Sequence, residues 1–402
     1  MSTAPAPHAQ GCGSLPGVIT APRHYCDGVL IVHVSDCYPP RTGGIETQVR
    51  DLARAQVAQG HEVHVLTATP GPAGERGGLV QDDDGVRVHR LGARIPFGLP
   101  VNPAAPPRVR ALLRELRPDV VHVHAGVLSP FAFDGARVAV DAGVPVVVTW
   151  HCMLDGTVPA LRAAVRRSRW ASAPMALSAV SGAAAQRVGE VFDAPVGVVP
   201  NGMDLARWAP DATAPSPAGP LRCVATMRLA PRKRGPALIG VVADAVAQLG
   251  PGSLTLDVIG DGPARASMER RVARAGLTDV VRLRGRLERA GVRAAYTQAQ
   301  VFVAPAVLEA FGIAALEARA AGLVVVAHRA TGIAEFVTDG VDGLLVDDDA
   351  AMVRALVRLS REPALLARLQ ARARADRPTH DWALTLEAAQ REYVRAAELA
   401  GR

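Results

Sequence analysis

The sequence predicts an α/β protein with two doubly wound, Rossmann-like domains that face a central cleft. Three observations support this class: the length of 402 residues, the alternation of short apolar runs with helical patterns, and a stretch rich in proline and alanine near the middle. A single hydrophobic core usually stops growing at about 250–300 residues, so two domains are the natural division. Short apolar runs between helices are typical of parallel strands that are covered on both faces.

The first series of apolar runs predicts an N-terminal domain over residues 28–200. Its expected strands are Val29–Val34, Glu62–Leu66, Val86–Leu91, Asp119–His124, Pro145–Trp150, Met175–Val180 and Val196–Val199. Residues 1–27 are expected to form a disordered leader. Residues 201–220 are expected to form a linker, because the run from Ala209 to Pro220 is rich in residues that favour loops.

The second series predicts a C-terminal domain over residues 221–380. Its expected strands are Leu221–Met227, Leu254–Ile259, Val280–Leu283, Gln300–Ala304, Leu323–Ala327 and Leu344–Val346. Helical patterns lie between and after them, at Pro236–Leu249, Pro263–Ala275, Asp349–Ala375 and Trp382–Leu399. We expect the last helix, within residues 381–402, to pack back toward the N-terminal domain.

Composition argues against several classes of protein. No run approaches the roughly 20 consecutive apolar residues of a membrane span, and residues 1–27 lack the basic start and apolar core of a signal peptide. The five cysteines are scattered without a C-x-x-C pair, which argues against a zinc cluster and a disulfide framework. These observations favour a cytoplasmic protein.

The net charge of +7 is spread along the chain. Residues 1–200 hold 18 arginines and 16 acids, and the remainder holds 27 basic residues and 22 acids, so neither half is a nucleic-acid-binding arm. One local basic cluster lies beside Trp170 and comprises Arg162, Arg166, Arg167 and Arg169. It is either a solvated helix face or a peripheral contact with an anionic membrane or acceptor.

Loops after strands deserve most weight, because ligands of doubly wound sheets bind at the carboxyl ends of the strands. Gly43 and Gly44 follow the first expected strand and lead into a helix, where glycines let the backbone approach a ligand. The first strand of the second domain leads into a loop with Arg228 and Lys233. Lys233 is the only lysine among 45 basic residues, which indicates either a need for a compact ammonium or the chance survival of one lysine.

The segment Glu309-Ala-Phe-Gly-Ile-Ala-Ala-Leu-Glu317 is the most informative part of the sequence. A helix is expected only after Pro305, with Phe311-Gly312 at the turn before it, so Glu309 falls in the loop and Glu317 within the helix. The free N–H groups of the first helical turn would favour an anion such as a diphosphate. The alternative is an exposed loop acid followed by a solvated helix acid.

In this order and on these loops, Gly43-Gly44, Arg228, Lys233 and the Glu-x7-Glu segment resemble the retaining nucleotide-sugar glycosyltransferases of family 4, which have the GT-B fold. Further landmarks extend the resemblance over most of the chain: His122-Val-His124, Thr149-Trp150-His151, Val199 to Asp204, Ile259 to Gly262, and Gly332 to Val346. The resemblance implies an α/β GT-B enzyme whose N-terminal domain faces the acceptor and whose C-terminal domain binds a nucleotide sugar.

The resemblance also implies a role for each candidate residue. Arg228 and Lys233 hold the donor diphosphate, and its cradle is completed by backbone at Phe311, Gly312 and Ile313 and, from the first domain, at Gly43 and Gly44. Glu317 binds the ribose hydroxyls, since carboxylates accept hydrogen bonds strongly. Glu309 lies beside the donor sugar and His151 faces it. The residues implied in catalysis are Glu309, His151, Lys233 and Arg228.

The implied reaction moves a hexosyl group from GDP-mannose or a UDP-sugar to an acceptor hydroxyl of a lipid, polysaccharide or small molecule. No metal and no other cofactor is implied, because the two cations meet the diphosphate charge. Retention is expected from attack on the same face, with Glu309 positioning the sugar without acting as a nucleophile. The alternatives are a nucleotide-sugar epimerase or hydrolase and a non-catalytic binding protein. An oxidoreductase is disfavoured because no expected strand precedes G-x-G-x-x-G.

Three further features carry predictions. The acidic runs Asp82–Asp84 and Asp347–Asp349 are interpreted as loop and cap acids, not metal ligands. Many relatives have glycine directly after the lysine, whereas this chain has Arg234, so the loop is expected to shift by up to one residue. The apolar stretch over residues 92–107 is either an acceptor or membrane contact or an ordinary packed loop.

Overall fold

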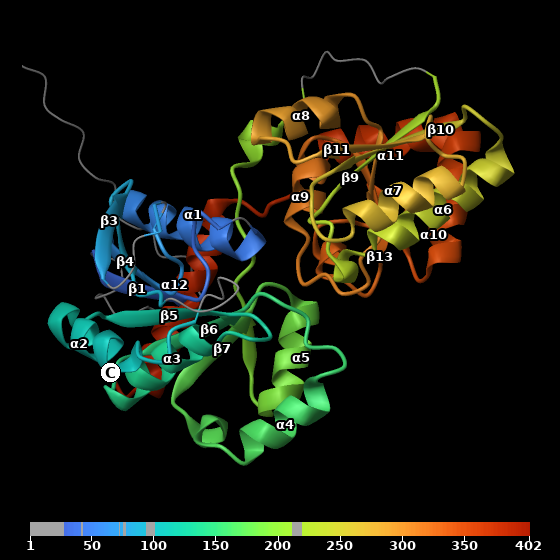
Figure 1. Cartoon of the computed structure of the whole chain (residues 1–402). Coiled ribbons are helices and arrows are strands. Elements are labelled where there is room, and N and C mark those ends of the chain that lie inside the picture. The colour runs from blue at the N-terminus through green and yellow to red at the C-terminus, as the bar shows by residue number, and fades with distance from the viewer. Residues whose placement is uncertain (1–27, 42, 72, 75–77, 94–100, 211–218) are drawn as a thin grey trace, which may run out of the picture.

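The computed structural model describes residues 28–402 except for 42, 72, 75–77, 94–100 and 211–218. The expected leader and the middle of the apolar stretch at 92–107 lie outside the described residues. Two α/β domains lie side by side and each is built on its own sheet (Figure 1). The predicted fold class, with two Rossmann-like domains, is confirmed.

The N-terminal sheet has eight strands in the order β3-β4-β2-β1-β5-β6-β7-β8, and only β3 is antiparallel. The strands are β1 Leu30–Ser35, β2 Glu62–Thr67, β3 Leu79–Asp83, β4 Val86–Arg90, β5 Val120–Ala125, β6 Val146–Trp150, β7 Met175–Ala179 and β8 Val196–Val198. The helices are α1 Gly44–Ala58, α2 Pro106–Leu116, α3 Pro130–Asp141, α4 Val158–Arg166 and α5 Gly182–Phe192, with 3-10 turns at Arg169–Ser172 and Leu205–Trp208.

The C-terminal sheet has six parallel strands in the order β11-β10-β9-β12-β13-β14. They are β9 Leu221–Thr226, β10 Leu254–Ile259, β11 Val281–Gly285, β12 Val301–Ala304, β13 Val324–His328 and β14 Gly343–Val346. The helices are α6 Gly235–Leu249, α7 Arg265–Arg274, α8 Arg289–Thr297, α9 Ile313–Ala320, α10 Asp349–Arg361, α11 Pro363–Ala375 and α12 Trp382–Leu399, with 3-10 turns at Pro231–Lys233 and Gly332–Glu335.

The structure contradicts one predicted element and adds one that the sequence did not indicate. The single helix expected at Asp349–Ala375 is divided into α10 and α11, because Pro363 has no N–H to donate and disfavours a helical residue before it. Strand β3 was not expected, since its alternately exposed residues end in acids. It forms a hairpin with β4 through Asp84 and Gly85, which both have positive φ.

Helix α12 follows the C-terminal domain in sequence but packs on the N-terminal sheet, beside β5, β6 and β7 (Figure 1). Its buried residues Ala388, Ala389 and Tyr393 share a core cluster with Ile31 and Val120 of the sheet. The helix therefore covers one face of β1 and β5. Because both sheets are parallel, the loops at the carboxyl ends of their strands can meet at a common cleft.

Candidate active site

A cleft of about 1880 Å³ lies between the two domains. Its wall contains all ten residues that the sequence singled out: Gly43, Gly44, His151, Arg228, Lys233, Glu309, Phe311, Gly312, Ile313 and Glu317. These residues come from loops after β1, β6, β9 and β12 and from the start of α9. The fold thus gathers residues that are more than 250 positions apart in the sequence.

The start of α9 is an open helix N-terminus in this cleft. Its N-cap is Gly312, which has φ +91 and contributes no side chain to cap the first turn. A Cβ atom at this position would lie 2.6 Å from Cγ1 of Ile333, so the turn requires glycine. Phe311 buries its ring against Phe336 and His380, which leaves only its backbone for the cleft. The N–H groups of this turn can therefore bind an anion.

The two walls approach each other at this helix start. A Cβ atom built on Gly44 would lie 3.4 Å from Cδ1 of Ile313, across the cleft. Gly44 begins α1, and Gly43, its N-cap, also lacks a capping side chain. Two uncapped helix N-termini, one from each domain, therefore face the same space.

The cationic loop after β9 contributes Arg228 and Lys233. The Lys233 ammonium donates a hydrogen bond to the Glu309 carboxylate, and both side chains are about one-fifth exposed. Arg228 is exposed, and its guanidinium has no ion-pair or hydrogen-bond partner among the residues that the structure describes. One cation is thus held by an acid of the site, and the other can turn toward a ligand.

Arg234 explains how the chain accommodates a residue other than glycine after the lysine. It adopts the left-handed conformation with φ +56, which glycine adopts most readily. Its guanidinium forms hydrogen bonds of 2.9 and 2.7 Å with the two carboxylate oxygens of Asp349 and one of 3.0 Å with the Pro305 carbonyl. These contacts tie the cationic loop to the loop before Glu309, while Lys233 lines the cleft.

Glu317 lies on α9, partly buried at the wall of the cleft. Burial raises the pKa of its carboxyl to about 7, and the positive charge of Arg289 opposes this rise. The carboxylate is therefore costly to ionise until hydrogen-bond donors reach it. Hydroxyl groups of a ligand can supply such donors.

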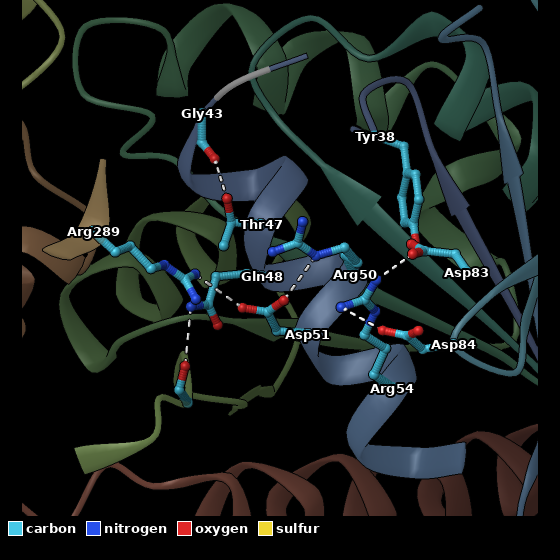
Figure 2. Close-up of polar contacts among 11 residues, drawn as sticks. Tyr38, Gly43, Thr47, Gln48, Arg50, Asp51, Arg54, Asp83, Asp84 and Arg289 are labelled. Atoms are coloured by element: carbon cyan, nitrogen blue, oxygen red, sulfur yellow. Dashed lines mark hydrogen bonds and ion pairs between the residues drawn. The ribbon is translucent and has the colours of Figure 1, made fainter. Parts of the chain in front are cut away.

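Arg289 and Asp51 were not found by sequence reasoning, yet they join the two domains. Arg289, at the start of α8, forms an ion pair with Asp51 on α1, with 3.2 Å between Nη2 and Oδ2. Figure 2 shows this contact. On the same helix, Gln48 donates a 3.0 Å hydrogen bond to the carbonyl of Gly202, in the segment between the domains. The position of Arg289 after strand β11 is a signal that could have marked it, but nothing in the sequence around Asp51 distinguishes it from other helix acids.

His151 follows β6, and its ring lies at the N-terminal wall of the cleft. Its Nε2 atom is 3.0 Å from Nδ1 of His124. Burial lowers the pKa of His151 to about 4, so the imidazole is neutral at physiological pH. It can therefore exchange hydrogen bonds with a ligand but brings no positive charge.

The acidic runs serve as loop and cap residues. Asp83 binds Arg54 and accepts a 2.7 Å hydrogen bond from the Tyr38 hydroxyl, and Asp84 lies 2.9 Å from Arg54 (Figure 2). Asp348 caps α10 through the N–H of Ala351. These acids are thus occupied by protein groups.

Comparison with known proteins agrees with this architecture. Residues 42–207 match the family described as Glycosyltransferase Family 4, and residues 221–362 match Glycosyl transferases group 1. A GDP-mannose-dependent alpha-mannosyltransferase of Mycolicibacterium smegmatis is 30% identical over 376 residues, which cover 85% of this chain and 92% of that protein. A phosphatidyl-myo-inositol mannosyltransferase of Mycobacterium leprae is 29% identical over 370 residues, which cover 88% of this chain and 94% of that protein.

Among solved structures, Anabaena HepE in complex with UDP and glucose superimposes with a TM-score of 0.69 at 19% identity, covering 90% of this chain and 99% of that one. The fold and the cleft thus define a glycosyltransferase of the GT-B class, and the chain is an enzyme of that kind. It belongs to glycosyltransferase family 4, as the sequence motifs predicted. None of the described helices is long and apolar enough to span a membrane.

Proposed function

We propose that this enzyme transfers a hexosyl group from a nucleoside diphosphate sugar to an acceptor hydroxyl, with retention of anomeric configuration. The observation that carries the proposal is the convergence of Arg228, Lys233 and the open N-terminus of α9 on one cleft. Cations and aligned N–H groups at one point are suited to a diphosphate. The M. smegmatis relative is named as GDP-mannose-dependent, and HepE was solved with UDP and glucose, which supports a nucleotide-sugar donor.

The leaving diphosphate explains the cations. When the glycosidic bond to phosphate breaks, negative charge grows on the diphosphate and positive charge on the sugar ring. Arg228 and Lys233 are already in place to meet the phosphate charge, so we propose that no metal is required. The Glu309 carboxylate holds Lys233 in the cleft. Binding of the diphosphate would let Lys233 turn to phosphate and leave Glu309 facing the sugar.

The other groups fit the remaining parts of the donor. Glu317 would accept hydrogen bonds from the ribose hydroxyls. These hydrogen bonds would stabilise the ionised carboxylate, which burial otherwise disfavours. Same-face attack requires the acceptor hydroxyl to approach beside the departing phosphate, which can take its proton. This route needs no carboxylate nucleophile, so Glu309 acts by position and charge.

We further propose that the basic cluster meets an anionic membrane or an anionic acceptor. Arg162 and Arg169 pair with Asp193 at 3.7 Å and Asp141 at 3.0 Å. Arg166 and Arg167 are exposed and have no carboxylate partner among the described residues. Sedimentation with neutral and anionic vesicles, comparing wild type with R166A/R167A, tests the contact. Equal binding to both vesicle types would rule out the contact with an anionic membrane.

Donor and reaction can be tested together. A thermal-shift screen of UDP-, GDP- and TDP-sugars identifies the donor, since a ligand at 100 times its Kd adds about 2.7 kcal/mol of stability. The stabilising donor is then incubated with candidate acceptors in the presence of EDTA, and products are identified by mass spectrometry and by NMR of the anomeric proton. A glycoside of retained configuration supports the proposal. A free epimer, a free sugar alone, or dependence on a metal contradicts it.

A further inference from the structure

Four histidines lie on or just after three neighbouring strands of the N-terminal sheet, toward the carboxyl ends of these strands. His33 lies on β1, His122 and His124 lie on β5, and His151 follows β6. The rings of His33 and His124 have centroids 5.1 Å apart, and those of His124 and His151 are 5.2 Å apart. Three of them are at most 3% exposed, so their ring nitrogens need protein partners.

A continuous series of hydrogen bonds runs inward from His151 at the cleft. His151 Nε2 lies 3.0 Å from His124 Nδ1, and His124 Nε2 lies 2.9 Å from His33 Nδ1. His33 Nε2 lies 2.6 Å from Gln56 Oε1 on α1. The Gln56 amide nitrogen in turn lies 2.7 Å from the Tyr393 hydroxyl on α12. The series thus connects the cleft to the last helix of the chain.

The series continues from Tyr393 to a backbone carbonyl. The Tyr393 hydroxyl is 2.9 Å from Nδ1 of His122, whose Nε2 is 2.7 Å from Thr149 Oγ1. The Thr149 and Ser178 hydroxyls are 2.7 Å apart, and Ser178 donates to the Val148 carbonyl at 3.4 Å. We call the eight side chains the histidine network: His151, His124, His33, Gln56, Tyr393, His122, Thr149 and Ser178.

The carbonyl at the end of the network sets the direction of every proton in it. A carbonyl oxygen only accepts, so Ser178 donates to Val148 and must accept from Thr149. Each hydroxyl has one proton, and each neutral imidazole donates through one nitrogen and accepts through the other. His122 therefore donates from Nε2 and accepts from Tyr393. Tyr393 uses its proton for His122 and accepts from the Gln56 amide nitrogen. The Gln56 Oε1 atom then accepts from His33 Nε2, and His33 Nδ1 accepts from His124 Nε2.

The last member is His151, which must donate from Nε2 to His124. Its Nδ1 atom is then unprotonated and has no hydrogen-bond partner among the residues that the structure describes. The rule holds only for neutral rings. Burial supplies that condition, because it lowers the pKa of His33 to about 4 and holds the pKa values of His122 and His124 well below the ordinary value of a histidine.

A metal ion is the competing interpretation of this cluster. One nitrogen from each of His33, His122 and His124 lies within 4.8 Å of the others, a spacing that could hold an ion. However, all six of their ring nitrogens already have hydrogen-bond partners. An ion would have to displace several of these bonds, so we favour the hydrogen-bonded network.

We propose that the histidine network fixes His151 as the neutral Nε2–H tautomer and presents its Nδ1 to the cleft as a hydrogen-bond acceptor. An acceptor selects a hydroxyl, which can donate, over a phosphate or ring oxygen, which cannot. Building on the proposed function, that hydroxyl belongs to the transferred sugar. Gln56 and Tyr393 are then positioning residues that act through His124 and His33, although neither lies beside the reacting atoms.

The tautomer itself is tested without any substrate. The full-length protein is labelled with 15N-histidine, and long-range 1H–15N NMR spectra distinguish the protonated nitrogen of each neutral ring. His151 is assigned from its absence in H151N. The network predicts a protonated Nε2 and an unprotonated Nδ1. A protonated Nδ1, or changes at His33, His122 and His124 on addition of Zn²⁺, would overturn the proposal.

The substitution Tyr393→Phe tests the remote control of that tautomer. It keeps the ring but removes the hydroxyl that orients the Gln56 amide, so His151 should become a mixture of both tautomers. Affinity for the sugar nucleotide should fall by about twofold to tenfold, the scale of one hydrogen bond, while affinity for the nucleoside diphosphate alone should not change. The matched control is Tyr38→Phe, which removes another buried tyrosine hydroxyl of the same domain, bonded to Asp83.

Unchanged His151 spectra in the Tyr393→Phe protein would contradict remote control. Equal losses of affinity in both tyrosine variants would mean that the effect is only structural. If no sugar nucleotide binds at all, the proposed function fails, whereas the NMR spectra still decide the tautomer. The two proposals can therefore fail independently.

Discussion

The two walls of the cleft present different chemistry to the same ligand space. The C-terminal wall carries Arg228, the Lys233–Glu309 pair and an open helix start. At the facing position, the N-terminal wall carries Gly44 and the neutral His151. The charged α1 residues Arg50, Asp51 and Arg54 are held in ion pairs with other protein groups (Figure 2). The comparison indicates that charge recognition is concentrated on one domain, whereas the other offers backbone and neutral hydrogen-bond groups.

Removal of Lys233 should have the largest effect. In Lys233→Ala, we expect kcat to fall by about 10² or more, the scale of losing one preorganised charge that stabilises the transition state. Turnover is measured at saturating donor. The matched control is Arg54→Ala, which removes a cation of the N-terminal wall that pairs with Asp83 and Asp84. Comparable losses of kcat in the two variants would contradict the conclusion that charge recognition is concentrated on the C-terminal wall.

Glu317→Ala should act mainly on donor binding. The ribose contact proposed for Glu317 would be made in the ground state and the transition state alike, so KM for the donor should rise while kcat changes little. We expect a rise of about tenfold or more, since hydrogen bonds to a charged group contribute roughly 1.5–3 kcal/mol. Steady-state kinetics with varied donor provide the measurement, and an unchanged KM would remove Glu317 from the donor site.

Glu317 should also lower the stability of the free enzyme at neutral and alkaline pH. The pKa of Glu317 is about 7 in the folded protein and 4.5 as the reference value for the unfolded chain. Between pH 4.5 and pH 7 the native state therefore binds more protons than the unfolded state. Stability contributed by this group is therefore present below about pH 4.5 and lost as pH rises toward 7. Glu317→Gln should be more stable than wild type above pH 7, on the order of 1 kcal/mol, and the gain should vanish in acid. Thermal unfolding across this pH range tests the sign.

The sheets were predictable from sequence because buried parallel strands leave continuous apolar runs between helices. Strand β10 at Leu254–Ile259 and helix α12 at Trp382–Leu399 have the predicted bounds. Strand β3 was missed because its residues at the edge of the sheet are exposed or half-buried and two of them are acids. The break before Pro363 shows that a proline can begin a new helix inside an apolar pattern that reads as continuous.

Sequence could predict those residues of the site whose positions depend on a single strand and the loop after it. The candidates from Gly43 to Glu317 lie on loops after strands or in the first two turns of a helix, where position in the sequence indicates position in the cleft. Contacts that depend on the arrangement of two elements left no such signal. Asp51 meets Arg289 only because α1 and α8 face each other, and Tyr393 reaches His122 only because α12 returns to the first domain.

Substitutions in the Arg289–Asp51 pair should have the smallest effects, and they test the two walls separately because each wall contributes one residue. Arg289 is 57% exposed in this 3.2 Å pair, and exposed ion pairs contribute about 0.2–1 kcal/mol. Asp51→Asn should therefore change affinity for the nucleoside diphosphate by less than about fivefold, with a smaller dependence on salt.

Arg289→Gln should change this affinity more than Asp51→Asn does, because the loss of its charge raises the pKa of Glu317 further and moves the pH midpoint of binding upward. Titration calorimetry at several pH values separates the two variants, and a loss in Asp51→Asn as large as that in Glu317→Ala would place charge recognition on both domains.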